Sequence, residues 1–103
     1  MKHGLSQETI KSLNEIFSKY NKIYKVVLYG SRAKGNYKNG SDIDLTLFGD
    51  DINLELLHKI ELEIDDLLLP YKVDLSVYND LNNEDLKEHI SRVGIVLFLS
   101  RVS

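Results

Sequence analysis

Apolar residues along this chain recur with two periods, one typical of helices and one typical of strands. Spacings of three and four residues predict a helix over residues 6–20, where Ser6 is a suitable N-cap, and further helices over 53–68 and 83–92. The segment from Gly30 to Gly35 is expected to form a tight turn into a short helix.

Three segments carry strand patterns. A continuous apolar run predicts a strand over 25–29 that is covered on both sides, and strict alternation predicts strands over 42–48 and 71–78. The expected order is therefore α-β-α-β-α-β-α, an α/β (α+β) chain with helices layered on one sheet. Residues 95–99 are also apolar, and either a fourth short strand or an extension that packs on a partner explains them.

Length and composition limit the class of protein. The 103 residues suffice for one compact domain, 1–103, and the 43% of hydrophobic residues can build a core. Cysteine is absent, which excludes disulfides and thiolate metal sites. The net charge of −3 gives no strong nucleic-acid signal, and no apolar run reaches the roughly 20 residues that span a bilayer. We therefore expect a cytoplasmic protein without a membrane partner.

Acidic residues lie on the polar side of two predicted strands. Asp42 and Asp44 are two residues apart, so both side chains leave the same face, with about 6.6 Å between their Cα atoms. Carboxylates this close repel one another, and Mg²⁺ relieves the repulsion because it prefers oxygen ligands and substrate phosphates. Asp74 joins the same face if the two strands pair. Three such carboxylates can hold two metal ions about 3.5–4 Å apart, the arrangement used for phosphoryl displacement.

A glycine–serine turn follows the first predicted strand. Gly30 allows a close approach of the backbone, the following amides can face an anion, and the Ser31 hydroxyl can bond a phosphate oxygen. Arg32 and Lys34 add positive charge nearby. Taken singly, this segment is also explained as an ordinary capped turn, and the acidic residues as solvated strand ends. The two features together favour a phosphate and metal site.

The combined motifs resemble those of a known family. The segments GSRAKG, from Gly30 to Gly35, and GSDIDL, from Gly40 to Leu45, resemble the signature of the DNA polymerase β-like nucleotidyltransferases. The similarity is greatest to the minimal stand-alone branch, the MNT proteins, and Asp74 matches the family's third acidic position. It covers nearly the whole chain and implies a small mixed sheet flanked by helices, the polymerase β-like palm fold.

The resemblance also implies an activity, the transfer of a nucleoside monophosphate from an NTP, usually ATP, to a hydroxyl with release of pyrophosphate. Gly30 and Ser31 would then bind the triphosphate. Asp42 and Asp44 would bridge two Mg²⁺ ions, and Asp74 would bind the catalytic ion and help to activate the acceptor hydroxyl. Arg32 matches a position of the nucleotide-binding motif, where contact with phosphate and support of the loop both remain open.

Stand-alone members of this family typically pair with a small all-helical HEPN-domain protein. Several such pairs resemble toxin–antitoxin modules in which the MNT protein is the antitoxin and adenylylates its partner. The resemblance thus implies an MntA-like antitoxin, and either a homo- or a hetero-oligomer is compatible with it. The alternative is a non-catalytic antitoxin that neutralises a HEPN partner by contact, which the apolar residues 95–99 keep open. A purely structural domain would require an accidental match of the motifs.

The remaining candidate residues are assigned structural roles. We expect His3, His58 and His89 to be structural or solvated, because they are scattered along the chain. Tyr29 and Tyr78 border the expected site, and we assign both to packing ahead of stacking on a base.

Overall fold

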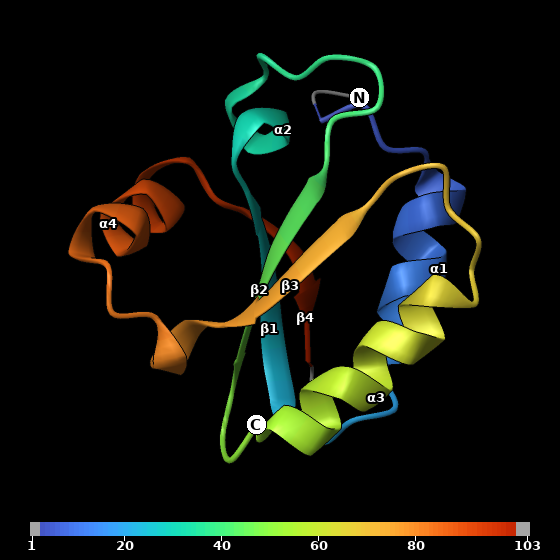
Figure 1. Ribbon diagram of the computed structural model, residues 1–103, viewed down its shortest axis with the longest axis vertical. Coiled ribbons are helices and arrows are strands. Elements are labelled where there is room, and N and C mark those ends of the chain that lie inside the picture. Colours follow the sequence, from blue (N-terminus) through green and yellow to red (C-terminus); the bar gives the residue numbers. More distant parts are fainter. Residues whose placement is uncertain (1–2, 101–103) are drawn as a thin grey trace.

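The computed structural model of the protein describes residues 3–100. Its elements, in chain order, are α1 (Gln7–Phe17), β1 (Ile23–Tyr29), α2 (Ser31–Lys34), β2 (Ile43–Gly49), α3 (Leu54–Asp65), β3 (Val73–Val77), the single 3₁₀ turn η1 (Tyr78–Asp80), α4 (Glu84–Val93) and β4 (Ile95–Leu99). Figure 1 shows these elements arranged around one central sheet. The α/β class expected from the sequence is confirmed.

Within residues 3–100, four strands form one mixed sheet in the order β3-β2-β1-β4. The β2 and β3 strands are parallel, whereas β1 pairs antiparallel with β2 and with β4. The order α-β-α-β-α-β-α was therefore incomplete, because residues 95–99 add a strand at the edge next to β1. This apolar segment pairs with β1 and buries Leu97, although its Val96 and Leu99 side chains remain exposed.

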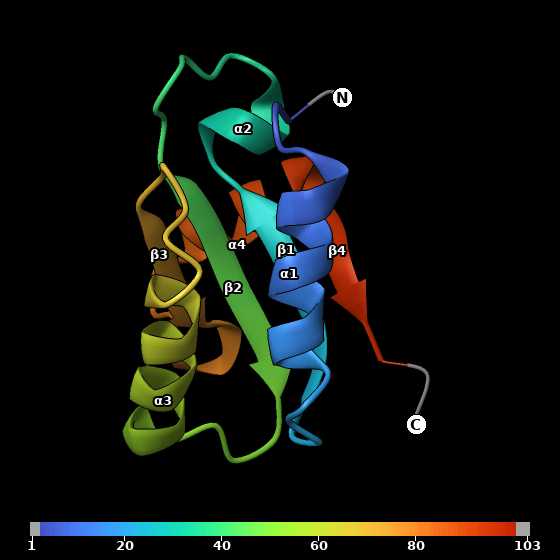
Figure 2. The ribbon, with the colours of Figure 1, turned by 90° about the vertical axis from the view of Figure 1, so that its right-hand side faces the viewer.

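The face of the sheet that α1 and α3 cover holds most of the hydrophobic core (Figure 2). Alternate residues of the strands point into it, because successive strand side chains leave opposite faces. The residues of this core that are fully buried on the strands include Val26, Leu28, Ile43, Leu45 and Leu47. Phe17 of α1 and Ile60 of α3 close the layer from the helix side.

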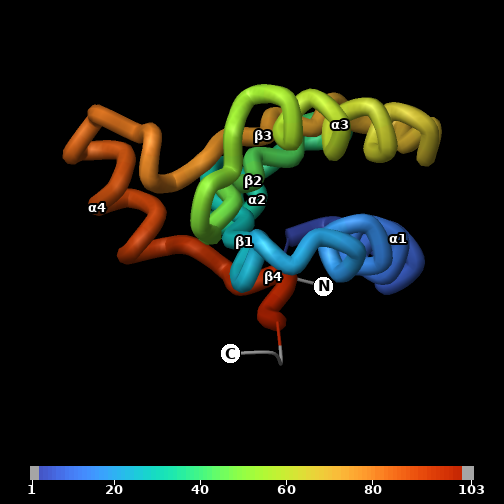
Figure 3. The backbone as a smooth tube through the Cα atoms, turned by 90° about the horizontal axis from the view of Figure 1, so that it is seen from below, coloured from blue at the N-terminus to red at the C-terminus, as the bar shows by residue number. Residues whose placement is uncertain are grey.

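The opposite face is covered only in part, by α4, which lies on the other side of the sheet from α1 and α3 (Figure 3). The cluster here is smaller and consists of Val27, Tyr29 and Ile90, with four partly buried neighbours. Much of this face is therefore left to polar side chains of β2 and β3.

Each of the three longer helices begins at a capping side chain. Ser6 accepts a hydrogen bond from the amide of Thr9, as expected, and Asn53 and Asn83 cap α3 and α4 in the same way. Two of the predicted helices extended about three residues too far, since α1 ends at Phe17 and α3 at Asp65, whereas α4 ends at Val93, within one residue of its expected end. No helix among residues 3–100 is both long enough and apolar enough to cross a membrane.

Candidate functional site

Two carboxylates meet on the sheet face opposite α1 and α3. Asp44 of β2 lies directly across from Asp74 of β3 in the parallel register. The strands are about 4.8 Å apart, and the next residues along each strand, Leu45 and Leu75, are buried in the main core. The pairing expected from the two alternating patterns therefore occurs, and it places both carboxylates on the same polar face.

Asp44 is the most enclosed of the three acidic side chains. It is half-buried, whereas Asp74 and Asp42 are exposed, and Asp42 stands just before β2 begins. Burial, then the charge of Asp74 and then that of Asp42, raises the pKa of the Asp44 carboxyl above its ordinary value, while His89 acts in the opposite direction. The negative charges of the group therefore oppose one another at Asp44.

The expected three-carboxylate metal group is only partly assembled. Among the described residues, no group of three or more acidic, histidine or cysteine side chains gathers closely enough to hold a metal ion by itself. What the fold presents is the Asp44–Asp74 pair, with Asp42 at its margin. This oxygen donor set fits Mg²⁺, which commonly takes one or two carboxylates and completes its shell with water and substrate phosphates.

Gly30 brings the phosphate turn against the carboxylates. Its backbone has φ +78° and ψ −156°, a conformation that is essentially restricted to glycine. A Cβ atom at this position would lie 2.3 Å from Oδ2 of Asp44. Both the backbone conformation and the contact therefore require glycine, and they place the turn between β1 and α2 directly beside Asp44.

The Ser31 side chain and the following lysine are available on this turn. Ser31 is half-buried, and within residues 3–100 its hydroxyl makes no hydrogen bond. Lys34 is exposed at the end of α2. The turn thus combines a free hydroxyl with a nearby cation, as expected for a group that binds a phosphate.

Arg32 supports the loop, which is one of the two roles, with phosphate contact, that its motif position left open. It is 2% exposed, and its guanidinium donates to the carbonyl of Ser41 at 3.1 and 3.0 Å and to that of His3 at 2.9 Å. The rings of Tyr37 and Tyr71 lie 5.0 and 4.6 Å from its central carbon. Because Ser41 precedes Asp42, Arg32 fixes the entry into β2, and contact of its guanidinium with a phosphate stays a prediction.

Two side chains near the carboxylates were not expected to be part of the site: His89 was expected to be structural or solvated, and Tyr29 to pack ahead of stacking on a base. The imidazole of His89, on α4, accepts a hydrogen bond at its Nε2 from the backbone amide of Gly30, at 3.1 Å. Tyr29 lies opposite Asp44 in the antiparallel register. Burial raises the pKa of Tyr29, the neighbouring Ser76 side chain acts in the opposite direction, and the charges of Asp44 and Asp74 raise it further.

The sequence carries a signal for only one of these two residues. Tyr29 directly precedes Gly30, so the sequence alone predicts that it lies near the turn. Knowledge of the register between β1 and β2 would also have predicted that it lies opposite Asp44. His89 is separated from Gly30 by 59 positions. Its approach depends on where α4 docks, which no pattern in the chain specifies.

Comparison with known proteins identifies the family to which this chain is similar. The family model described as polymerase beta, nucleotidyltransferase, matches residues 11–101. The chain is 33% identical over 91 residues to "Putative protein adenylyltransferase MJ1217" of Methanocaldococcus jannaschii, a match that covers 81% of this chain and 92% of the relative. It is 30% identical over 90 residues to "Putative protein adenylyltransferase MJ0604" of the same organism, covering 84% and 90%.

Solved structures share the fold. A crystal structure described as a toxin–antitoxin with AMP-PNP superposes with a TM-score of 0.71 at 20% identity, covering 94% of this chain and 76% of the other. A structure described as tri-AMPylated Shewanella oneidensis HEPN toxin in complex with MNT antitoxin gives 0.70 at 16% identity, covering 94% and 75%. The fold, the family match and the paired carboxylates agree: the chain belongs to the polymerase β family and is a nucleotidyltransferase.

Proposed function

We propose that this nucleotidyltransferase transfers AMP from ATP to a hydroxyl group of a HEPN-domain protein and thereby acts as an MntA-like antitoxin. The observation that carries the proposal is the contact of three parts of the site: Asp44 opposite Asp74, and Gly30 against Asp44. A phosphate held at the turn would lie beside both carboxylates, which is what transfer at the α-phosphorus requires.

The triphosphate would be held by the amide of Gly30 and by the hydroxyl and amide of Ser31. Asp42, Asp44 and Asp74 would hold Mg²⁺ together with phosphate oxygens, and the metal would supply neutralisation of the charge that develops on the phosphates. Lys34 would add positive charge at the outer end of the turn. Of the two carboxylates that face each other, Asp44 is half-buried and Asp74 is exposed, which supports a further role for Asp74 in activating the acceptor hydroxyl.

The transfer itself forms one bond and breaks one. The oxygen of the acceptor hydroxyl bonds the α-phosphorus of ATP, and the bond from that phosphorus to the bridging oxygen of pyrophosphate breaks. The acceptor proton passes to the Asp74 carboxylate, which is open to solvent and can release it. The products are an adenylylated acceptor and pyrophosphate.

A protein acceptor is supported by the two archaeal relatives named as protein adenylyltransferases. A HEPN acceptor is supported by the fold shared with the antitoxin of the AMPylated HEPN complex. We therefore place the acceptor hydroxyl on a HEPN protein encoded next to this one.

The direct test is incubation of the purified chain with Mg²⁺, ATP labelled at the α-phosphate, and the neighbouring HEPN protein. We expect label on the HEPN protein, and we expect Asp42→Asn to abolish it. The matched control is Asp50→Asn, which makes the same change at an exposed acidic residue beyond the other end of β2. That variant should label as well as the unchanged protein.

Two other outcomes have definite meanings. If the HEPN protein is neutralised without labelling, the chain is the non-catalytic antitoxin that binds by contact. Mg²⁺-ATP should also stabilise the folded chain by about 2.7 kcal/mol at 100 times its dissociation constant. The absence of any stabilisation by ATP would contradict nucleotide binding itself.

A further inference from the structure

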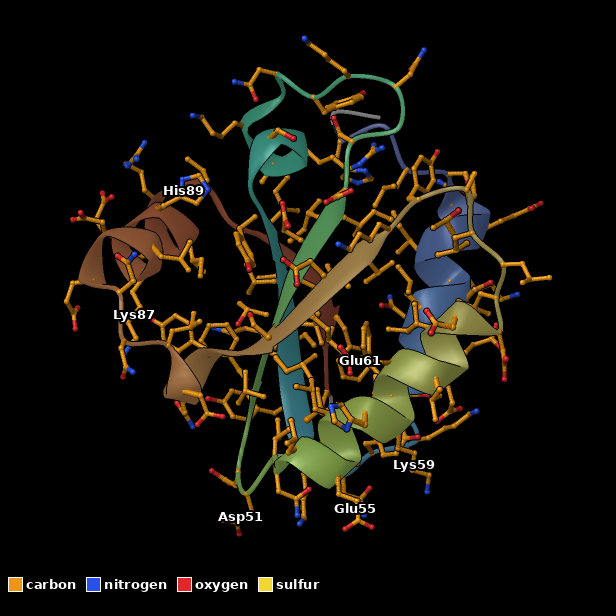
Figure 4. The ribbon with its side chains drawn as sticks, viewed as in Figure 1. Asp51, Glu55, Lys59, Glu61, Lys87 and His89 are labelled. Atoms are coloured by element: carbon orange, nitrogen blue, oxygen red, sulfur yellow. The ribbon has the colours of Figure 1, made fainter. Side chains whose placement is uncertain are left out.

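His89, on α4, is hydrogen-bonded to the backbone amide of Gly30, the group at which a phosphate is proposed to bind. The Nε2 atom of His89 accepts the hydrogen bond of the Gly30 amide at 3.1 Å. Figure 4 shows the His89 side chain directed from α4 toward α2 and the upper end of β1, while Lys87, two residues earlier, points elsewhere. The imidazole therefore reaches the turn from the side of the sheet that carries Asp44 and Asp74.

The position of the imidazole is fixed by its surroundings. Its ring meets the Tyr29 ring edge-on, with centroids 6.3 Å apart and an angle of 81°. The next residue, Ile90, is 3% exposed and packs with Val27 and Tyr29, which fastens this part of α4 to β1. A ligand that displaces Nε2 from the Gly30 amide leaves the imidazole at the border of the site, because α4 keeps it there.

The displaced imidazole can form a hydrogen bond with the phosphate that displaces it. While Nε2 accepts from Gly30, the ring proton of the neutral imidazole is on Nδ1. Once a phosphate oxygen takes the Gly30 amide, the other neutral tautomer can donate from Nε2 to a phosphate oxygen. Among the described residues, His89 forms no hydrogen bond or ion pair with a carboxylate, so the ring is not already bonded to one when it leaves the Gly30 amide.

We propose that His89 is a nucleotide-binding residue, which α4 supplies to contact a phosphate of the bound nucleotide next to the Gly30 amide. This inference rests on the proposed nucleotide site and adds to it a residue outside both sequence motifs. It also gives α4 a direct role, since the helix then supplies a phosphate contact beside the turn.

The test measures the affinity of the full chain for Mg²⁺-ATP and for adenosine by calorimetry. Loss of one phosphate hydrogen bond in His89→Ala is expected to weaken ATP binding by about tenfold and to leave adenosine binding unchanged. His89→Gln retains a donor at about the same reach as Nε2, on a more flexible side chain, and should weaken ATP binding less. The matched control is His58→Ala on α3, where the side chain is 63% exposed, and it should bind like the unchanged protein.

A difference between ATP and adenosine separates contact with phosphate from a general effect on the fold, because a distorted fold would weaken both ligands. Equal losses for the two ligands would overturn the proposal. Unchanged or tighter ATP binding in His89→Ala would also overturn it, since the imidazole would then only block the Gly30 amide. If the unchanged protein binds no ATP, the proposed function fails together with this inference, whereas ATP binding that is insensitive to His89 removes the inference alone.

Discussion

The two faces of the sheet are made by alternate residues of the same strands, yet they differ in almost every physical respect. On the face under α1 and α3, the side chains of Ile43, Leu45 and Leu47 are completely buried. On the other face, Asp44 is half-buried and Asp74 is exposed. Adjacent residues of β2 therefore face either a close-packed core or a group of negative charges that repel one another.

This difference shows how a small domain can support an unfavourable site. The apolar face contributes the large hydrophobic term that stabilises the fold. The charged face lowers stability, because the Asp44 carboxylate is half-buried and lies near Asp74 and Asp42, and within residues 3–100 it forms no ion pair with a cation. We therefore expect substitutions on one face to affect mainly stability and substitutions on the other to affect mainly activity.

Asp44→Asn should separate the two faces most strongly. It removes a proposed metal ligand, so AMP transfer should fall by roughly 10³-fold, or about 4 kcal/mol of transition-state stabilisation. The folded protein without metal should be as stable as before or more stable, because the cost of burying the Asp44 charge disappears together with its repulsion by Asp74 and Asp42. Labelling rates and urea unfolding measure the two effects. A large loss of stability would contradict the division between the faces.

Leu45→Ala makes the reverse change at the next residue. The side chain is fully buried, and its truncation leaves a cavity that should lower the free energy of unfolding by about 3 kcal/mol. Activity per folded molecule should be retained, because the side chain points away from the carboxylates. Urea unfolding gives the first quantity, and labelling at a temperature where the variant is folded gives the second. Leu45→Met, which conserves volume, should cost less than about 1.5 kcal/mol.

Gly30→Ala tests the point where the turn touches the charged face. The added Cβ meets Asp44 and the backbone has a positive φ, so we expect a loss of about 1–3 kcal/mol in stability together with loss of nucleotide binding. Gly35→Ala is the matched control, because its φ is also positive, at +89°, but the space around it is open. Gly35→Ala should show only the backbone cost and should still bind ATP.

The pH dependence of stability should show the smallest effect. Because the pKa of Asp44 is raised in the folded state, folding takes up a proton at this group. Its contribution to stability therefore falls as pH rises from about 4, the ordinary value, through the raised value. The difference in unfolding free energy between the unchanged protein and Asp44→Asn, measured without metal across about pH 4–7, should grow with pH. A difference that does not change with pH would contradict the raised pKa of Asp44.

The sequence went far in predicting the secondary structure and the two motifs. Alternation in 42–48 and 71–78 placed Asp44 and Asp74 on the polar side of their strands, because strand side chains alternate by geometry alone. The turn at Gly30 was also predicted from neighbouring residues, because a glycine directly follows the apolar run 25–29. The Ile95–Leu99 segment was left open, since a short apolar run does not say whether it pairs within its own chain or packs on another.

The amino-acid sequence by itself determined which residues alternate, where the helices are capped and which acidic and glycine motifs are present, because these depend on neighbours along the chain. Only the tertiary structure decided that Asp74 faces Asp44, that Arg32 holds the carbonyl of Ser41, and that His89 reaches Gly30. Those contacts depend on strand order and on the docking of α4. Both are set by the packing of the whole core rather than by any local pattern.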